Sequence, residues 1–76
     1  MQNNEEKSAL KYGKVHNYDG YLGEIITEDT IYYFDKTDVL NNELLENEDW
    51  VRFNGKSEDE FPQAYYITKQ LIYKSK

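Results

Sequence analysis

The sequence of 76 residues contains no cysteine and a single histidine, His16. Without cysteine, the chain has neither a disulfide framework nor a thiolate metal site. One imidazole also excludes histidine-rich metal sites and Cys–His catalytic pairs. We therefore expect no metal and no cofactor, and we expect His16 to face solvent from a strand.

Long apolar runs are lacking as well. No run approaches the roughly 20 apolar residues that a membrane-spanning helix needs. Residues 1–6 are polar and acidic, whereas a secretory signal is basic and then apolar. We expect a cytoplasmic protein that makes no contact with a membrane.

Basic residues are scarce, with nine Lys and Arg against 15 Asp and Glu, for a net charge of −6. Residues 31–60 carry a net charge of −6, and residues 61–76 carry +3. A net negative field weakens binding to phosphate backbones, although a basic end can still steer an anion. A solvated, solubilising surface explains the same distribution. The acidic run of residues 58–60 matches no calcium loop and is interpreted in this way.

Aromatic residues are plentiful for so polar a chain, with eight Tyr, three Phe and one Trp. Aromatic and β-branched residues favour a pleated, half-buried surface, so the composition predicts an all-β domain. Five short strands are expected near residues 11–18, 21–28, 30–35, 48–54 and 61–69. The turn signals are Asp19-Gly20 and Glu28-Asp29, and a short helical turn beginning at Thr37 or Asp38 follows the third strand.

These elements predict one domain, a five-stranded antiparallel OB-like barrel over residues 11–69. Residues 1–10 are expected to form a flexible arm, or a short helical turn from Glu5 to Leu10, and residues 70–76 a basic tail. Gly13 and Gly23 are interpreted as packing or bulge positions. The predicted core consists of Val15, Ile25, Ile31, Val51, Phe53, Ala64 and Ile67.

Several short motifs follow one another along the chain: GKV at residues 13–15 with NY at 17–18, LGEI at 22–25, YFDKTDV at 33–39, VRF at 51–53, PQA at 62–64 and ITK at 67–69. In their order and spacing they resemble the motifs of the cold-shock domain, a five-stranded OB-type barrel. The resemblance covers about residues 11–69. The resemblance implies binding of single-stranded RNA or DNA, with bases stacked on exposed aromatic rings and phosphates held by nearby cations.

Matched position by position, the family's seven stacking sites fall on Asn17, Tyr18, Leu22, Glu24, Tyr33, Asp35 and Lys36. Two of the seven are aromatic. Each base–aromatic stack is worth ~1–3 kcal/mol, so losing five removes at least about 5 kcal/mol, and we expect weak binding. The residues expected to contact nucleic acid are Lys14, Tyr18, Tyr21, Tyr33 and Lys36, with further charge from Lys11 and the lysines of the tail.

A second hypothesis is a protein-interaction module that has lost nucleic-acid binding. Its acidic face, bearing Tyr and Trp, would meet a basic protein or a second copy of the chain.

The aromatic group of Tyr18, Tyr21, Tyr32, Tyr33 and Phe34 serves as a stacking platform, as an anchor patch or as filling of the barrel. Trp50 and Arg52 alternate with core residues and should face outward, either as an interaction hot spot or with their side chains stacked on neighbouring strands. No enzymatic activity is expected, because no carboxylate pair is anchored by a motif.

Overall fold

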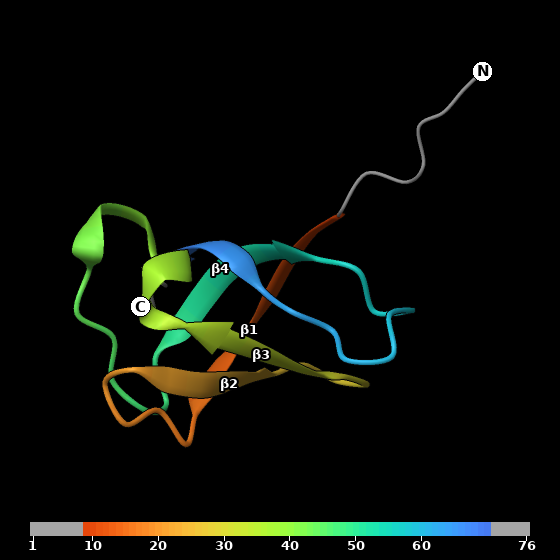
Figure 1. Ribbon diagram of the computed structural model, residues 1–76, viewed down its shortest axis with the longest axis horizontal. Helices are drawn as coiled ribbons and strands as arrows, with labels where there is room; N and C mark the ends of the chain where they lie inside the picture. The colour runs from red at the N-terminus through yellow and green to blue at the C-terminus, as the bar shows by residue number, and fades with distance from the viewer. Residues whose placement is uncertain (1–8, 71–76) are drawn as a thin grey trace, which may run out of the picture.

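The chain folds into five antiparallel strands (Figure 1). The computed structural model describes residues 9–70. The strands are β1 (Ala9–His16), β2 (Leu22–Ile26), β3 (Ile31–Asp35), β4 (Trp50–Gly55) and β5 (Tyr65–Lys69). Two 3₁₀ turns, η1 (Lys36–Asp38) and η2 (Leu40–Asn42), follow β3. The prediction of an all-β, OB-like barrel with a short helical turn after the third strand is confirmed.

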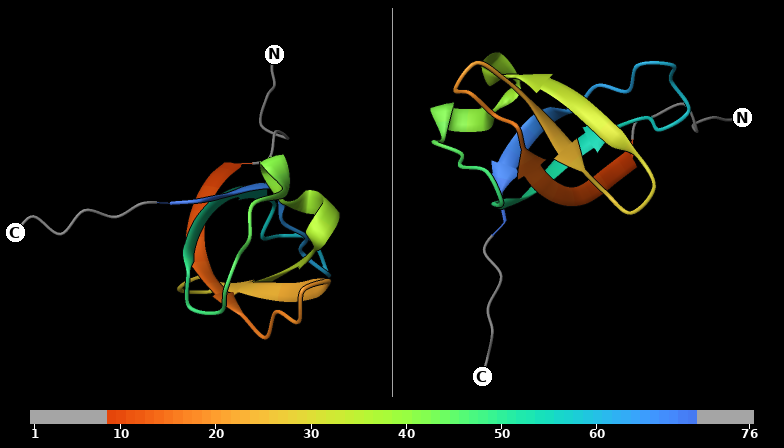
Figure 2. Two further views of the ribbon diagram at one scale, coloured as in Figure 1. Left: turned by 90° about the vertical axis from the view of Figure 1, so that its left-hand side faces the viewer. Right: turned by 90° about the horizontal axis from the view of Figure 1, so that it is seen from below.

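β1 lies at the centre of a single sheet with the strand order β3-β2-β1-β4-β5. The sheet curls until β3 meets the chain just before β5 (Figure 2). There the Tyr33 N–H donates to the carbonyl of Pro62 at 3.0 Å, and the Ala64 N–H donates to the carbonyl of Tyr33 at 2.9 Å. A second bridge joins Val39 to Ile67 in β5. Both edge strands are thus partly paired, which limits edge-to-edge association.

The barrel is filled by apolar side chains. The buried residues are Val15, Ile25, Tyr32, Phe34, Val39, Leu45, Val51, Phe53, Ala64 and Ile67. Six of the seven predicted core residues belong to this set, but the assignment of Ile31 was wrong. Ile31 is 43% exposed, because side chains alternate between the two faces of β3 and Tyr32 and Phe34 point inward. Tyr32 then packs edge-on against Phe53, with ring centroids 4.9 Å apart.

Most strand boundaries differ from the prediction by one or two residues, and the starts of β1 and β5 change which segments are paired. β1 begins at Ala9, within the segment expected to be an arm, and pairs with β4 as far as Gly55. β5 begins only at Tyr65, because residues 62–64 run beside Tyr33 of β3. The rest of the predicted arm, residues 1–8, and residues 71–76 of the predicted tail lie outside the described residues.

The connection between β1 and β2 contains the predicted Asp19-Gly20 turn. Oδ1 of Asp19 accepts hydrogen bonds from the N–H groups of Tyr21 and Leu22, each at 2.9 Å. Gly20 has a φ of +97°, in the region that favours glycine. The turn is therefore confirmed, within a connection that runs over residues 17–21.

Gly13 and Gly23 allow close approach of the chain to neighbouring side chains, as predicted. A Cβ atom on Gly23 would lie 2.8 Å from Cδ1 of Tyr18 and 2.9 Å from Cε1 of Phe34. On Gly13 it would lie 2.6 Å from Cγ2 of Ile25. A side chain at either position would displace core atoms in a close-packed interior.

Asp35 caps the first 3₁₀ turn. Its Oδ1 accepts hydrogen bonds from the N–H of Thr37 at 2.9 Å and from the Thr37 hydroxyl at 3.1 Å. Oδ2 of Asp38 in turn accepts from the N–H of Asp35 at 2.9 Å, which completes a reciprocal capping box. The predicted start of the turn at Thr37 or Asp38 was therefore wrong, because the turn begins directly at the end of β3 with Asp35 as its cap.

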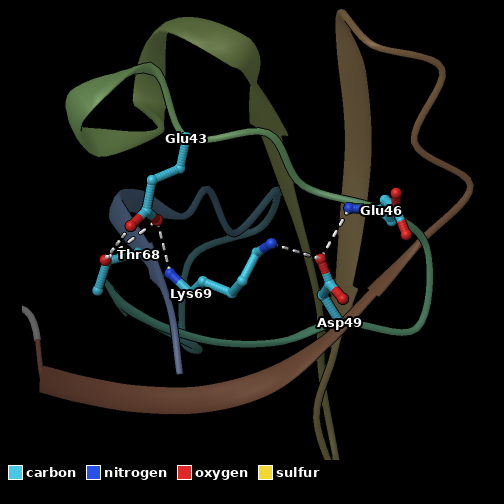
Figure 3. Close-up of polar contacts among 5 residues, drawn as sticks. All are labelled: Glu43, Glu46, Asp49, Thr68 and Lys69. Atoms are coloured by element: carbon cyan, nitrogen blue, oxygen red, sulfur yellow. Dashed lines mark hydrogen bonds and ion pairs between the residues drawn. The ribbon is translucent and has the colours of Figure 1, made fainter. Parts of the chain in front are cut away.

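The segment between η2 and β4 is tied to β5 by polar contacts (Figure 3). The carboxylate of Glu43 accepts a hydrogen bond from the N–H of Lys69 at 2.7 Å and from the hydroxyl of Thr68 at 3.2 Å. Nζ of Lys69 lies 3.6 Å from Oδ2 of Asp49, which also accepts from the N–H of Glu46 at 2.9 Å. Glu43 therefore satisfies a backbone donor on the outer edge of β5.

Candidate nucleic-acid interface

The outward side chains of the curled sheet form two surfaces of different chemistry. We define the β2–β3 face by the outward positions of those two strands, which are Leu22, Glu24, Ile26, Ile31, Tyr33 and Asp35. We define the β1–β4 face by the outward positions Tyr12, Lys14, His16, Trp50 and Arg52. β1 and β2 are hydrogen-bonded neighbours, so the two faces adjoin.

The β2–β3 face combines aliphatic groups with carboxylates and has no cation. Ile26 lies directly opposite Ile31, and Glu24 lies opposite Tyr33. Leu22 is opposite Asp35 at the end of the pair of strands. Both isoleucines and Tyr33 are substantially exposed. The face therefore offers one aromatic ring and an unfavourable field for phosphate.

The β1–β4 face pairs each aromatic ring with a cation. Lys14 lies opposite Trp50, and Tyr12 lies opposite Arg52. Nζ of Lys14 is 5.4 Å from the centroid of the Trp50 ring, within the range of a cation–π contact. Lys14 also forms an ion pair of 3.6 Å with Glu48. The predictions that Trp50 and Arg52 face outward and that His16 is exposed to solvent are confirmed.

A groove of about 760 Å³ runs along the β1–β4 face and reaches the turn between β2 and β3. Tyr12, Lys14 and Trp50 line it from the β1–β4 face. Glu28 and Asp29 line it from the turn. The groove thus brings aromatic rings and the cations Lys11 and Lys14 together with three carboxylates, Glu28, Asp29 and Glu48.

The five predicted contact residues are divided among four places. Lys14 lies on the β1–β4 face and Tyr33 on the β2–β3 face. Tyr21 and Lys36 lie together where β2 and β3 meet their connecting loops. There the N–H of Lys36 donates to the carbonyl of Tyr21 at 2.8 Å, and Nζ of Lys36 is 5.2 Å from the centroid of the Tyr21 ring. Tyr21 is 67% exposed.

Tyr18, the fifth, packs against the core. Its ring lies 5.0 Å from the ring of Phe34, and its N–H donates to Oδ1 of Asn47 at 2.8 Å. Burial raises the pKa of the Tyr18 hydroxyl, and the charges of Asp19 and Asp35 raise it further. One side of the residue lines a smaller pocket of about 300 Å³. The contact with Phe34 therefore gives Tyr18 a packing role.

Tyr12 is the residue of the β1–β4 face that sequence reasoning passed over as a site. Placing Val15 in the core already implied that Tyr12 and Lys14 share the opposite face, since side chains alternate along a strand. The partner of each residue across the sheet depends on the register between β1 and β4, which the local pattern does not define.

Within residues 9–70 there is no group of three or more side chains able to hold a metal ion. In the same stretch no helix has the length and apolar character to cross a bilayer. No protein-family model matches the chain, and no curated protein matches it either.

Proposed function

We propose that this chain is a divergent cold-shock-like module that binds single-stranded RNA or DNA weakly through the outside of its barrel. The observation that carries the proposal is the pairing of exposed rings with cations, Lys14 with Trp50 and Lys36 with Tyr21. Sequence-tolerant binding of single strands uses these same two elements, rings for the bases and cations for the backbone. In this proposal the protein binds in the cytoplasm and does not catalyse.

Weak binding follows from the charges that surround these pairs. Glu24 and Asp35 occupy the β2–β3 face, and the chain carries a net charge of −6. Tyr18 contributes little as a stacking surface because its ring packs on Phe34. Each lost stack is worth ~1–3 kcal/mol, and each 1.4 kcal/mol corresponds to a factor of ten in affinity.

A titration with labelled oligo-dT tests the proposal. At about 50 mM salt and up to tens of micromolar protein, we expect saturable binding that weakens steeply as salt is added, because bound phosphates release counterions. A duplex of the same length provides the control, since paired bases are not available for stacking. Absence of binding to the single strand under these conditions would remove the proposal.

The second candidate function is protein interaction through the β2–β3 face. The observation that favours it is the exposed pair Ile26 and Ile31, with Glu24 two positions away on β2 and Asp35 at the far end of β3 on the same face. Apolar surface bordered by acidic groups complements a basic, amphipathic protein segment. A second copy of the chain would have to overcome repulsion between two molecules of net charge −6.

An NMR titration with short single strands distinguishes the two candidates. Nucleic-acid binding shifts the amide signals of one contiguous face, whereas the protein-interaction candidate predicts no shift with the oligonucleotide. Sedimentation of the protein alone tests self-association separately. A dimer whose dissociation is promoted by Ile26→Lys would support the second candidate.

A further inference from the structure

We propose that a bound single strand runs along the β1–β4 face, over Tyr12, Lys14, Trp50 and Arg52, rather than along the β2–β3 face. This inference rests on the proposed function and adds the location of the contact surface.

The four side chains form a checkerboard. Trp50 lies opposite Lys14, and Arg52 lies opposite Tyr12, two positions further along the same pair of strands. Directly opposed side chains have Cβ atoms about 5 Å apart, and diagonal neighbours about 7–8 Å. The two rings therefore occupy one diagonal and the two cations occupy the other. Successive bases can stack on the rings while each ring has a cation beside it for phosphate.

The rings and the cations are accessible. Tyr12 is 51% exposed and Trp50 is 45% exposed. In the part of the chain that the structure describes, the Arg52 guanidinium makes no ion pair and no hydrogen bond. Lys14 forms an ion pair with Glu48 at 3.6 Å. Both side chains are exposed, so Glu48 competes only weakly with a phosphate for Lys14. A free Arg and a loosely held Lys are thus available to the ligand.

Tyr12, Lys14 and Trp50 share one continuous surface because all three line the groove, and Arg52 lies opposite Tyr12 on the same face. Three carboxylates also line the groove: Glu48, which is paired with Lys14, and Glu28 and Asp29 of the turn between β2 and β3. Asp29 accepts hydrogen bonds from the hydroxyls of Thr27 and Thr30, at 3.4 Å and 3.1 Å, as part of its turn. The six outward positions of the β2–β3 face instead hold two carboxylates and no cation. Electrostatics therefore favours the β1–β4 face for a polyanion.

Matched substitutions on the two faces test the location. Tyr12→Ala and Tyr33→Ala remove the same side chain from positions of similar exposure, on the β1–β4 and β2–β3 faces respectively. We expect Tyr12→Ala to weaken oligo-dT binding about five-fold or more and Tyr33→Ala to change it less than two-fold.

Arg52→Gln should reduce the slope of log affinity against log salt by about 1, whereas Lys56→Gln, in the loop after β4, should leave it unchanged. Circular dichroism of each variant checks that the barrel is folded.

Trp50 supplies a direct readout, because it is the single tryptophan of the chain. Stacking of a base on the indole should quench its fluorescence in proportion to the bound fraction and protect it from iodide. Trp50→Phe should retain most of the binding, and Trp50→Ala should lose it about five-fold or more.

Three outcomes decide the matter. Binding with quenched Trp50 and a loss on Tyr12→Ala supports the β1–β4 location. Binding that leaves Trp50 unquenched and is lost on Tyr33→Ala overturns the location and leaves the proposed function standing. If the protein binds no oligonucleotide, or binds only a basic peptide, both the β1–β4 location and the proposed function are overturned.

Discussion

The ring of Tyr18 lies against the ring of Phe34, with centroids 5.0 Å apart and planes inclined by 38°. Phe34 is buried in the core, and Tyr18 is partly buried where it packs on that core. A residue that the resemblance assigns to base stacking thus contributes to packing at the end of the barrel.

This contact predicts that Tyr18→Ala destabilises the fold. Removing a partly buried ring should cost about 1–3 kcal/mol, less than the ~3–5 kcal/mol of a fully buried aromatic residue. Tyr18→Phe should be close to wild type, because the Tyr18 hydroxyl makes no hydrogen bond within residues 9–70. Urea unfolding of both variants measures the difference. If Tyr18→Ala kept full stability but lost oligonucleotide binding, the residue would have a stacking role instead.

Gly23 makes this packing possible, and Gly23→Ala should therefore be destabilising. The added Cβ would lie 2.8 Å from Cδ1 of Tyr18 and 2.9 Å from Cε1 of Phe34. Overpacking of this kind typically costs about 1–3 kcal/mol. Urea midpoints of Gly23→Ala, of Tyr18→Ala and of the double variant measure the coupling. The double variant should be less unstable than the sum of the single effects, and strict additivity would contradict the proposed clash.

The strands and most of the core could be predicted from the alternation of polar and apolar residues, but the orientation of β3 could not. Its first four residues, Ile31 to Phe34, are all apolar or aromatic, so the period of two is hidden. Packing decides the matter. Tyr32 packs against Phe53. Its ring also lies next to Gly55, where an added Cβ would be only 2.9 Å from Cε2 of Tyr32.

The late start of β5 has a related cause. Residues 62–64 bridge to Tyr33 in a parallel direction, and this tertiary contact leaves no local pattern in the sequence.

Asp35 illustrates the same point for the candidate site. The resemblance treats it as a stacking site that has become acidic, whereas its carboxylate caps η1 through Thr37. Individual residues of the site could be proposed from sequence, but their partners depend on register and capping.

Glu43 fastens the segment after η2 to β5, so Glu43→Ala should destabilise that edge. Its carboxylate accepts hydrogen bonds from the Lys69 N–H and the Thr68 hydroxyl, and a hydrogen bond to a charged group is worth about 1.5–3 kcal/mol. We expect a stability loss of about that size and faster amide hydrogen exchange at Lys69. Glu46→Ala is the matched control, since Glu46 is exposed and contributes only its backbone N–H to this network. Unchanged exchange at Lys69 would show that the contact is not maintained in solution.

Asp19 should give the protein a component of acid sensitivity. Hydrogen bonds from the N–H groups of Leu22 and Tyr21 lower the pKa of this carboxyl below its ordinary value near 3.9. Because the pKa is lower in the folded state, the stabilisation is present above the unfolded-state pKa and is lost as the pH falls through the folded-state value. Asp19→Asn keeps an oxygen acceptor for the turn but removes the titration.

The expected result is that wild type exceeds Asp19→Asn in urea midpoint at pH 7 and that this advantage shrinks as the pH is lowered below about 3.9. Asp59→Asn provides the control, because the Asp59 side chain lies exposed in the loop before Pro62 and makes no hydrogen bond or ion pair within residues 9–70. The difference between wild type and Asp59→Asn should stay constant over the same range. An advantage of wild type over Asp19→Asn that persisted undiminished in acid would mean that the charge of Asp19 does not stabilise the turn, and that its oxygen acts only as a neutral acceptor.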